Sequence, residues 1–343
     1  MDLRNHPRLA FFDWTLRGIG QVVFQNNPLS GLVILLAILY NSWIYAFILL
    51  VGVVVGTGVA WLLKAERGLI ENGLYGFNSA LVGLALVAFT SENFRSGAFP
   101  SAGMLVYIVF GAALAAIAFA GIAALTGPHK VAALTAPFVL VAWLFLFAVL
   151  KFDAIEAGPL AKPVSPDQYA HAVTYVLPTW YMGIGNAIGQ IFFQDNWISG
   201  YLIVIGIAIN SRISACMALI GAALAAAVAV AFGAPEGAIR DGLFGYNAAL
   251  TAIALGGFFL VLTVRSFFYA LFGIVVSTWL WASVAIFLAP IKMPVLTSTF
   301  VIVTWLMLFG QYAFRALAPV PPAEATTPED NRRRYFARRR VDR

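Results

Sequence analysis

Residues 20–27 read Gly-Gln-Val-Val-Phe-Gln-Asn-Asn, and residues 189–196 read Gly-Gln-Ile-Phe-Phe-Gln-Asp-Asn. The two octapeptides begin 169 residues apart, and residues 18–31 match residues 187–200 at eight of fourteen positions. In the same register, Asn72-Gly-Leu-Tyr-Gly-Phe-Asn78 aligns with Asp241-Gly-Leu-Phe-Gly-Tyr-Asn247. Further on, Leu134-Thr-Ala-Pro-Phe138 aligns with Leu296-Thr-Ser-Thr-Phe300 at an offset of 162. The chain therefore contains a duplicated unit of about 165 residues, far longer than a solenoid repeat.

The composition indicates which solvent surrounds this duplicated unit. Of the 343 residues, 62% are hydrophobic and 10% are charged, whereas soluble domains are about 25% charged. Long apolar runs such as Trp43–Leu63 and Ser101–Leu125 recur along the chain, and no water-soluble core could bury all of them. We therefore predict an all-α polytopic membrane protein.

The charged residues predict how the repeats are oriented. Seven arginines lie in residues 331–343, and Arg4, Arg8 and Arg17 lie near the start. A basic tail can bind nucleic acid, but in a membrane protein it more often marks the cytoplasmic side. The linker Phe152–Asp167 has three acidic residues and one lysine, which suits the opposite side. Each half then crosses the membrane an odd number of times, and we predict inverted repeats.

Each repeat is predicted to contain about five transmembrane helices and one re-entrant half-helix. The expected spans of the first repeat are residues 28–40, 43–63, 73–90, 101–125 and 133–150. The preceding segment Phe11–Phe24 has fourteen residues and would rise only ~21 Å as a helix, too little to cross a ~30 Å hydrocarbon layer. We expect it to turn back at Gln25-Asn26-Asn27-Pro28. Interrupted segments at matching places in two halves indicate a transport site.

The predicted boundaries follow from these features. They are a cytoplasmic N-terminus (1–10), a first repeat (11–151), an extracytoplasmic linker (152–170), a second repeat (171–313) and a basic, disordered cytoplasmic tail (314–343).

Ionisable residues are almost absent from the predicted spans, although such residues usually mark ion or proton coupling. Their absence favours a passive path for a neutral solute over a coupled carrier. No metal-ligand spacing, nucleophile motif or carboxylate pair indicates an enzyme, a metal or a cofactor. For Asp195 a turn or capping role is favoured over contact with a solute.

Uncharged polar residues remain as candidates for the path. Gln21 and Gln190 are predicted to end the two half-helices, while Thr135 and Thr297 open the last span of each half. The last carbonyls of a helix lack backbone donors, so they would form a row of acceptors for a permeant with N–H groups. A single glutamine could equally form a helix–helix hydrogen bond, but two at equivalent positions, each followed by Phe24 or Phe193, favour a pore.

These motifs together resemble the urea transporter family over residues 11–309. The resemblance is carried by the Gln-x-x-Phe-x-Asn-Asn stretch, the Asn-Gly-Leu-x-Gly-Phe-Asn turn and a Leu-Pro-x-x-Thr-x-Pro-Phe signature. The first signature reads Val131-Ala-Ala-Leu-Thr-Ala-Pro-Phe138 and lacks the initial Leu-Pro. The second reads Met293-Pro-Val-Leu-Thr-Ser-Thr-Phe300 and has threonine in place of the later proline. Tyr246 stands where the family commonly has phenylalanine, and Gln190 where some relatives have glutamate.

The resemblance implies a trimeric channel with one pore per protomer, in which urea passes two aromatic slots and a central threonine constriction. Phe24 and Phe193 would form the slot walls together with Phe77, Leu81, Tyr246 and Leu250. The predicted pore residues are Gln21, Phe24, Phe77, Leu81, Thr135, Gln190, Ile191, Phe193, Tyr246, Leu250 and Thr297.

The expected partners are urea, membrane lipids and two further copies of the chain, with no nucleic acid and no cofactor. The expected location is the inner (cytoplasmic) membrane with both termini cytoplasmic. The alternatives are a channel for another small neutral solute, such as another amide, ammonia or water, and an ion-coupled transporter.

Overall fold

The computed structural model describes residues 6, 9–153, 155–158 and 174–341. Within these ranges the regular structure is helical, and the extended pairing consists of two isolated bridges, Ser91 with Ala157 and Leu260 with Pro319. The predicted all-α architecture is therefore confirmed. The predicted N-terminus and linker lie largely outside the described residues.

The helices of the two halves follow one another in the same order. Those of the first half are α1 (Ala10–Gln21), α2 (Pro28–Asn41), α3 (Trp43–Leu62), α4 (Arg67–Glu71), α5 (Gly76–Thr90), α6 (Glu92–Arg95), α7 (Ala102–Thr126) and α8 (Ala136–Ala148). Those of the second half are α9 (Leu177–Gln190), α10 (Trp197–Asn210), α11 (Arg212–Ala231), α12 (Glu236–Arg240), α13 (Tyr246–Ile253), α14 (Val264–Leu288) and α15 (Ser298–Gly310). A π-helical turn, η4 (Ala254–Phe258), extends α13, and α16 (Pro328–Val341) ends the described chain.

Short 3-10 turns extend several helices or stand in the C-terminal segment. They are η1 (Gly127–His129), η2 (Val149–Lys151), η5 (Ala289–Ile291), η6 (Gln311–Ala313) and η7 (Pro322–Glu324).

The five predicted spans of the first half correspond to α2, α3, α5, α7 and α8. Four helices of the described chain are long and apolar enough to span a bilayer: Trp43–Leu62, Ala102–His129, Arg212–Ala231 and Val264–Ile291. Six further apolar helices have 10–17 residues, fewer than the ~20 that a perpendicular span requires. Because tilting would shorten their span further, the short helices must be completed by neighbouring segments or matched by local thinning of the bilayer.

Capping side chains explain where the interrupted helices restart. The Asn27 side chain accepts hydrogen bonds from the backbone N–H groups of Leu29 and Ser30 at the start of α2. Asn196 makes the same two bonds at the start of α10. Asparagine is among the best capping residues because its oxygen satisfies otherwise unpaired helix donors. Because this asparagine is the last residue of each octapeptide, both helices restart at equivalent positions.

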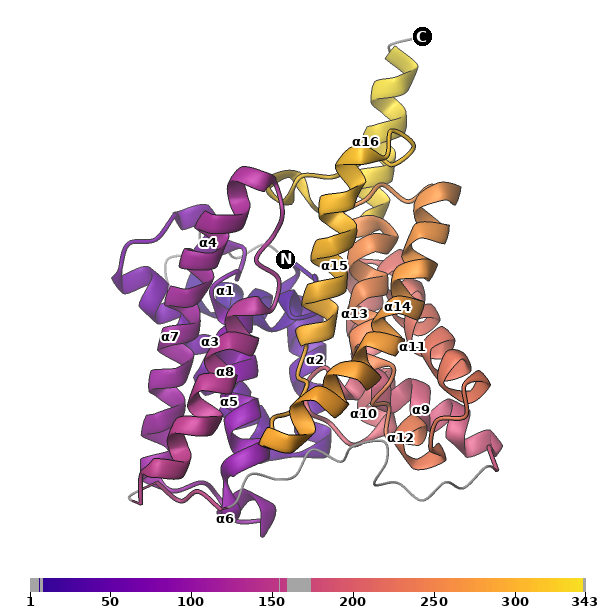
Figure 1. The fold of residues 1–343 in the computed structure, drawn as a ribbon. Helices are drawn as coiled ribbons and strands as arrows, with labels where there is room; N and C mark the ends of the chain where they lie inside the picture. The colour runs from indigo at the N-terminus through magenta and orange to yellow at the C-terminus, as the bar shows by residue number, and fades with distance from the viewer. Residues whose placement is uncertain (1–5, 7–8, 154, 159–173, 342–343) are drawn as a thin grey trace.

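The two halves lie side by side in Figure 1, the first in indigo to magenta and the second in pink to orange. They meet where α2 packs against α10, and the Ser199 hydroxyl of α10 donates to the Ala37 carbonyl of α2 at 2.9 Å. Asn210, at the end of α10, donates to the Gln25 amide oxygen of the first octapeptide at 3.0 Å. Asn41, at the end of α2, likewise donates to Gln194 of the second at 2.8 Å. Each interrupted helix is therefore held by the opposite half.

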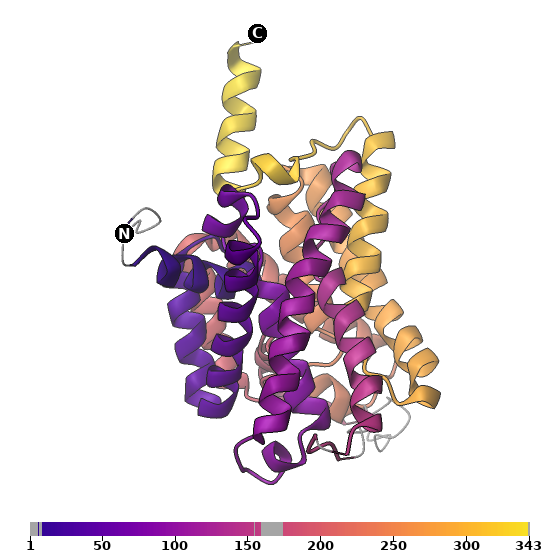
Figure 2. The same cartoon turned by 90° about the vertical axis from the view of Figure 1, so that its left-hand side faces the viewer.

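Part of the C-terminal segment that we expected to be disordered forms a helix, α16 (Pro328–Val341). Helix α16 projects from the end of the molecule opposite α6 (Figures 1 and 2). The Glu329 carboxylate accepts hydrogen bonds from the Ser211 hydroxyl at 2.7 Å and from the Ile213 amide at 2.9 Å, at the start of α11. Arginine and alanine are good helix formers, so this anchored sequence forms a helix despite its charge.

Candidate functional site

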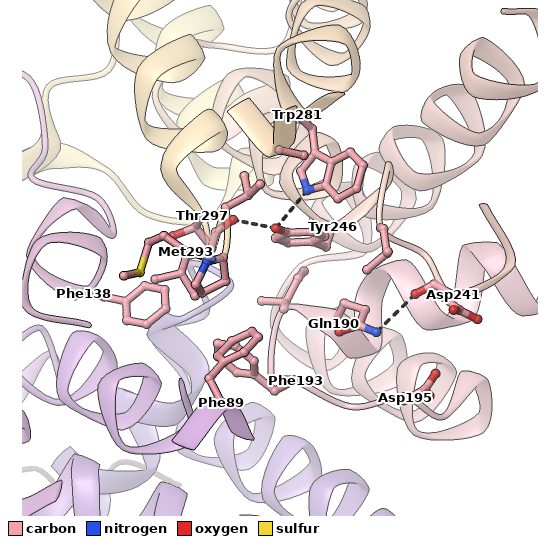
Figure 3. Close-up of a pocket in the computed structure, with 16 residues that line it drawn as sticks. Phe89, Phe138, Gln190, Phe193, Asp195, Asp241, Tyr246, Trp281, Met293 and Thr297 are labelled. Atoms are coloured by element: carbon pink, nitrogen blue, oxygen red, sulfur yellow. Dashed lines mark hydrogen bonds between the residues drawn. The ribbon is translucent and has the colours of Figure 1, made fainter. Parts of the chain in front are cut away.

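Two cavities lie within the bundle, and each contains one of the repeated glutamines. The Gln190 cavity has a volume of about 270 Å³ and contains Gln190, Ile191, Phe193, Tyr246 and Thr297 on its wall (Figure 3). The Gln21 cavity has a volume of about 560 Å³ and contains Gln21, Phe24, Phe77 and Thr135. Nine of the eleven predicted pore residues therefore line one of two cavities. Leu81 and Leu250 are fully buried and lie on neither wall.

The threonines of the two signatures meet between the cavities. The hydroxyl oxygens of Thr135 and Thr297 are 2.6 Å apart and share a hydrogen bond, and each residue is only 3% exposed. Because Thr135 lines the Gln21 cavity and Thr297 the Gln190 cavity, this contact lies where the two cavities approach one another. The sequence spacing alone did not show that the two hydroxyls touch.

Two asparagines hold in place the turns that contain Thr135 and Thr297, here called the threonine turns. Asn247 donates to the Leu296 carbonyl at 3.0 Å and accepts from the Phe300 amide at 3.0 Å. Asn78 makes the equivalent bonds to Leu134 and Phe138 in the first half. Leu134 and Leu296 have φ angles of 53° and 51°, which are unusual for a bulky side chain and are maintained only where the surroundings enforce them. The turns that present the threonines are thus rigidly supported.

The half-helices end at the predicted glutamines, because α1 ends at Gln21 and α9 ends at Gln190. The Gln21 side-chain amide donates to the Asn72 carbonyl at 2.8 Å, and Gln190 donates to the Asp241 carbonyl at 3.2 Å. Each glutamine therefore forms an internal hydrogen bond and also lines a cavity. With the amide nitrogen used in this way, the amide oxygen is the atom that suits an incoming N–H donor.

The row of free carbonyls that we expected after each half-helix is shorter in the structure. The backbone N–H of Gln25 donates to the backbone carbonyl of Gly20 at 2.9 Å, and the backbone N–H of Phe24 donates to that of Gln21 at 3.1 Å. In the second half, the backbone N–H of Gln194 donates to the Gly189 carbonyl, and that of Phe193 donates to the backbone carbonyl of Gln190. The turn itself therefore satisfies the last helical carbonyls, as in other helix ends that close with a left-handed residue.

The rings nearest to Phe24 and Phe193 were not among the predicted wall residues, although Phe77 lines the same cavity as Phe24 and Tyr246 the same cavity as Phe193. The Phe24 ring lies 4.8 Å from the Phe258 ring, and the Phe193 ring lies 5.9 Å from the Phe89 ring, centroid to centroid. In both cases the partner comes from the opposite half of the chain. Phe89 aligns with Phe258 at the offset of 169, so the repeat contained a signal for this pair. Phe24 and Phe193 have φ angles of 63° and 59°, so the backbone strain is also repeated.

Tyr246 differs from its counterpart Phe77 by a hydroxyl that is fully engaged (Figure 3). This hydroxyl donates to the Leu296 carbonyl at 2.6 Å and accepts from the Trp281 indole at 3.1 Å. In the first half the corresponding residues are Phe77 and Phe119, whose rings pack edge to face. Tyr246 and Trp281 therefore replace an apolar pair with a hydrogen-bonded one.

We expect Tyr246→Phe to lower the free energy of unfolding by about 1–3 kcal/mol, because the buried Trp281 N–H loses its acceptor. Adding Trp281→Phe recreates the first-half pair and should recover part of the loss. Unfolding in mixed detergent micelles measures both variants. A double variant no more stable than Tyr246→Phe would show that the unpaired indole is not the cause.

Two charged residues lie close to the cavities. Asp195 is exposed and lines the Gln190 cavity, and the capping role at α10 belongs to its neighbour Asn196. Arg17, which we counted among the basic residues near the start of the chain, is only 3% exposed and forms an ion pair with Asp13 at 2.9 Å. Its guanidinium also donates to Asn26 on the Gln21 cavity. Among the described residues, no group of three or more His, Cys, Asp or Glu could hold a metal ion.

The family model described as "Urea transporter" matches residues 12–312 of the chain. Over 345 residues the chain is 31% identical to "Urea transporter 1" of Ovis aries, covering 97% of this chain and 86% of the relative. It is 30% identical over 333 residues to "Urea transporter 1" of Mus musculus, covering 96% of this chain and 84% of that relative. With the match spanning both half-helices, both threonine turns and both glutamines, the chain belongs to the urea transporter family.

Proposed function

We propose that this chain conducts urea passively across the membrane, along a path that joins the Gln21 and Gln190 cavities at the threonine pair. The family is one of transporters rather than enzymes. The observation that carries the proposal is the Thr135–Thr297 contact, because it brings one hydroxyl from each half to the place where two similar cavities approach.

The groups on the path match the chemistry of urea. Urea is planar and neutral, with four N–H donors and one carbonyl acceptor, and an amide that loses water without new partners costs a few kcal/mol. Each cavity offers a glutamine amide, and the threonine pair offers hydroxyls that both donate and accept. Phenylalanine rings such as Phe24 and Phe193 face a flat molecule without supplying any charge. Weak contacts of this kind bind the solute and still release it.

The 2.6 Å Thr135–Thr297 hydrogen bond leaves no room for urea between the two oxygens. Passage therefore requires the threonines to exchange their mutual bond for bonds to urea. Since a hydroxyl can rotate to suit its partner, this exchange keeps both side chains paired throughout. The pair acts as a constriction that selects molecules able to replace its hydrogen bond.

The two repeats are proposed to be inverted in the membrane. Ala157, in the described start of the linker, pairs with Ser91 beside α6, at one end of the molecule, while α16 projects from the other (Figure 1). This arrangement supports a linker and a C-terminus on opposite sides. The arginine-rich tail then places α16 on the cytoplasmic side. The family resemblance implies a homotrimer, and an inner-membrane location is part of the proposal.

An ion-coupled mechanism has less support. Of the charged groups near the Gln21 cavity, Arg17 is already paired with Asp13, so this carboxylate is not available as an isolated ion or proton site. A channel for another small neutral solute remains the second candidate, because glutamine and threonine also suit other amides and water.

The function is tested by reconstituting the protein into liposomes and measuring shrinkage and swelling by stopped-flow light scattering. Under an inward urea gradient we expect a permeability well above that of empty liposomes, unchanged by dissipating proton and sodium gradients. Urea, acetamide, ammonia and water are compared in the same vesicles. A protein that raises only water or ammonia permeability would support the second candidate, and one that raises none would refute passive transport.

A further inference from the structure

The C-terminal segment 318–331, here called the strap, crosses one end of the bundle (Figures 1 and 2). It begins as a short extended pairing in which the Val261 amide donates to Ala318 and the Val320 amide donates to Phe259, at 2.9 and 2.8 Å. The strap lies beyond residues 12–312, which match the family model.

The strap supplies part of the wall of the Gln21 cavity. Six of its residues line that cavity: Pro321, Pro322, Ala323, Ala325, Thr326 and Thr327. Residues of the strap do not line the Gln190 cavity. The two ends of the proposed path are thus built differently, with a segment of the C-terminus completing only one of them.

Asn331, at the C-terminal end of the strap, binds the segment that carries the aromatic slot. Its side chain is 4% exposed, and its amide nitrogen donates to the Gly257 and Phe258 carbonyls at 3.0 and 3.1 Å. Its amide oxygen accepts from the Thr326 hydroxyl at 2.9 Å and from the Thr326 amide at 3.3 Å. One buried side chain therefore joins the cavity wall to the helix end beneath it.

The helix end that Asn331 binds is interrupted. Gly256 and Gly257 leave helical geometry in the π-helical turn η4, and Gly257 has φ of 141°, which is reserved almost entirely for glycine. A Cβ at Gly257 would also overlap Pro328 of the strap. In the first half the aligned residues Val87 and Ala88 lie within the uninterrupted helix α5. The break in the second half exposes carbonyls that the first half keeps within its helix.

Phe258, whose carbonyl Asn331 binds, is the nearest ring partner of Phe24. Their centroids are 4.8 Å apart, and the next ring, Phe259, is 5.6 Å from Phe24. Both rings line the Gln21 cavity. A shift of the broken helix end would therefore move Phe258 relative to Phe24 and change the width of this slot.

We infer that Asn331 is a positioning residue for the aromatic slot of the Gln21 cavity. By binding the Gly257 and Phe258 carbonyls it holds the Phe258 ring against Phe24, and the C-terminal strap thereby sets which urea analogues enter this end of the path. The inference rests on the proposed transport of urea along the two cavities.

The test compares the permeabilities of N-methylurea and urea in proteoliposomes. Asn331→Asp keeps the size of the side chain and an oxygen for Thr326, but it replaces the donor with an oxygen that faces two carbonyls. We expect the N-methylurea/urea permeability ratio to rise about threefold. This is smaller than the discrimination of about tenfold or more that a tight pocket achieves for one methyl group, because the variant loosens only one side of the slot. A ratio is independent of how much protein is reconstituted, so a lower yield of folded protein alone does not move it.

Asn331→Ser provides a second variant, since its shorter side chain cannot span both carbonyls, and it should shift the ratio in the same direction. Asp330→Asn is the matched control, because it removes only the exposed ion pair with Arg333, and it should keep the wild-type ratio. Wild-type ratios in both Asn331 variants, or an equal shift in the control, would overturn the inference. Absence of urea flux in the wild-type protein would instead refute the proposed function.

Discussion

Replacing Thr135 and Thr297 together with valine is expected to lower urea permeability by about 10- to 100-fold. Valine has nearly the same shape as threonine, so each side chain keeps its size while the constriction loses both hydroxyls, although two methyl groups cannot approach as closely as the hydrogen-bonded oxygens. A urea molecule between them would leave one or more N–H groups unpaired, which costs about 1–3 kcal/mol at the narrowest point, and each 1.4 kcal/mol corresponds to a factor of about ten. Stopped-flow light scattering on proteoliposomes measures the change.

The matched control for this prediction is Thr57→Val. Thr57 is also almost fully buried, and it lies on neither cavity wall. We expect wild-type urea permeability for this variant. Each single variant, Thr135→Val or Thr297→Val, keeps one hydroxyl and should lose less than the double variant. If the double variant conducts urea like the control at equal protein density, the threonine pair is not part of the path.

The fold was largely predictable because the repeat made each observation count twice. A half-helix ending at Gln21 could be inferred from the fourteen-residue segment before the first span, and the same reasoning at Gln190 gave α9 its end. Helix lengths and restarts depend on local residues such as the capping asparagines Asn27 and Asn196. The all-helical membrane class followed from composition alone.

The ring partners of the slots were less accessible to prediction. The predicted wall residues did not include Phe258, yet this ring from the other half is the nearest one to Phe24, and the predicted Leu81 is buried away from the cavity. Pairing between halves depends on how the two repeats dock, and an internal alignment shows equivalent positions without showing contacts. The alignment of Phe89 with Phe258 could have identified these two rings as candidates, but it does not show which glutamine each ring accompanies.

The C-terminal segment shows a different limit of prediction. Its high arginine content resembled that of disordered tails, and no repeat partner existed to test this interpretation. The structure adds two specific anchors, Glu329 at the start of α11 and Asn331 at the end of α13. Both are tertiary contacts with residues about 70 to 120 positions away in the chain, so no local pattern could reveal them.

The buried Asp13–Arg17 pair carries the second large prediction. We expect Asp13→Asn or Arg17→Met to lower the free energy of unfolding by about 3–5 kcal/mol, because removing one partner leaves the other charge buried without its counter-ion. Asp13 is 2% exposed and Arg17 is 3% exposed, so water cannot readily replace the missing partner. Unfolding of the purified protein by sodium dodecyl sulfate in mixed micelles measures the loss.

The second repeat supplies the control for this prediction, because it builds the same half-helix without the ion pair. At the offset of 169, Met182 and Asn186 occupy the positions of Asp13 and Arg17, and Asn186 donates to the Arg240 carbonyl at 2.8 Å instead. The double variant Asp13→Met with Arg17→Asn removes both charges and should lose less stability than either single variant. This result would show that the cost of each single change comes from the stranded charge, since neutral residues at both positions already support a half-helix in this chain. A double variant as unstable as the sum of the two singles would show that each side chain acts independently, Arg17 then acting mainly through its bonds to Asn26.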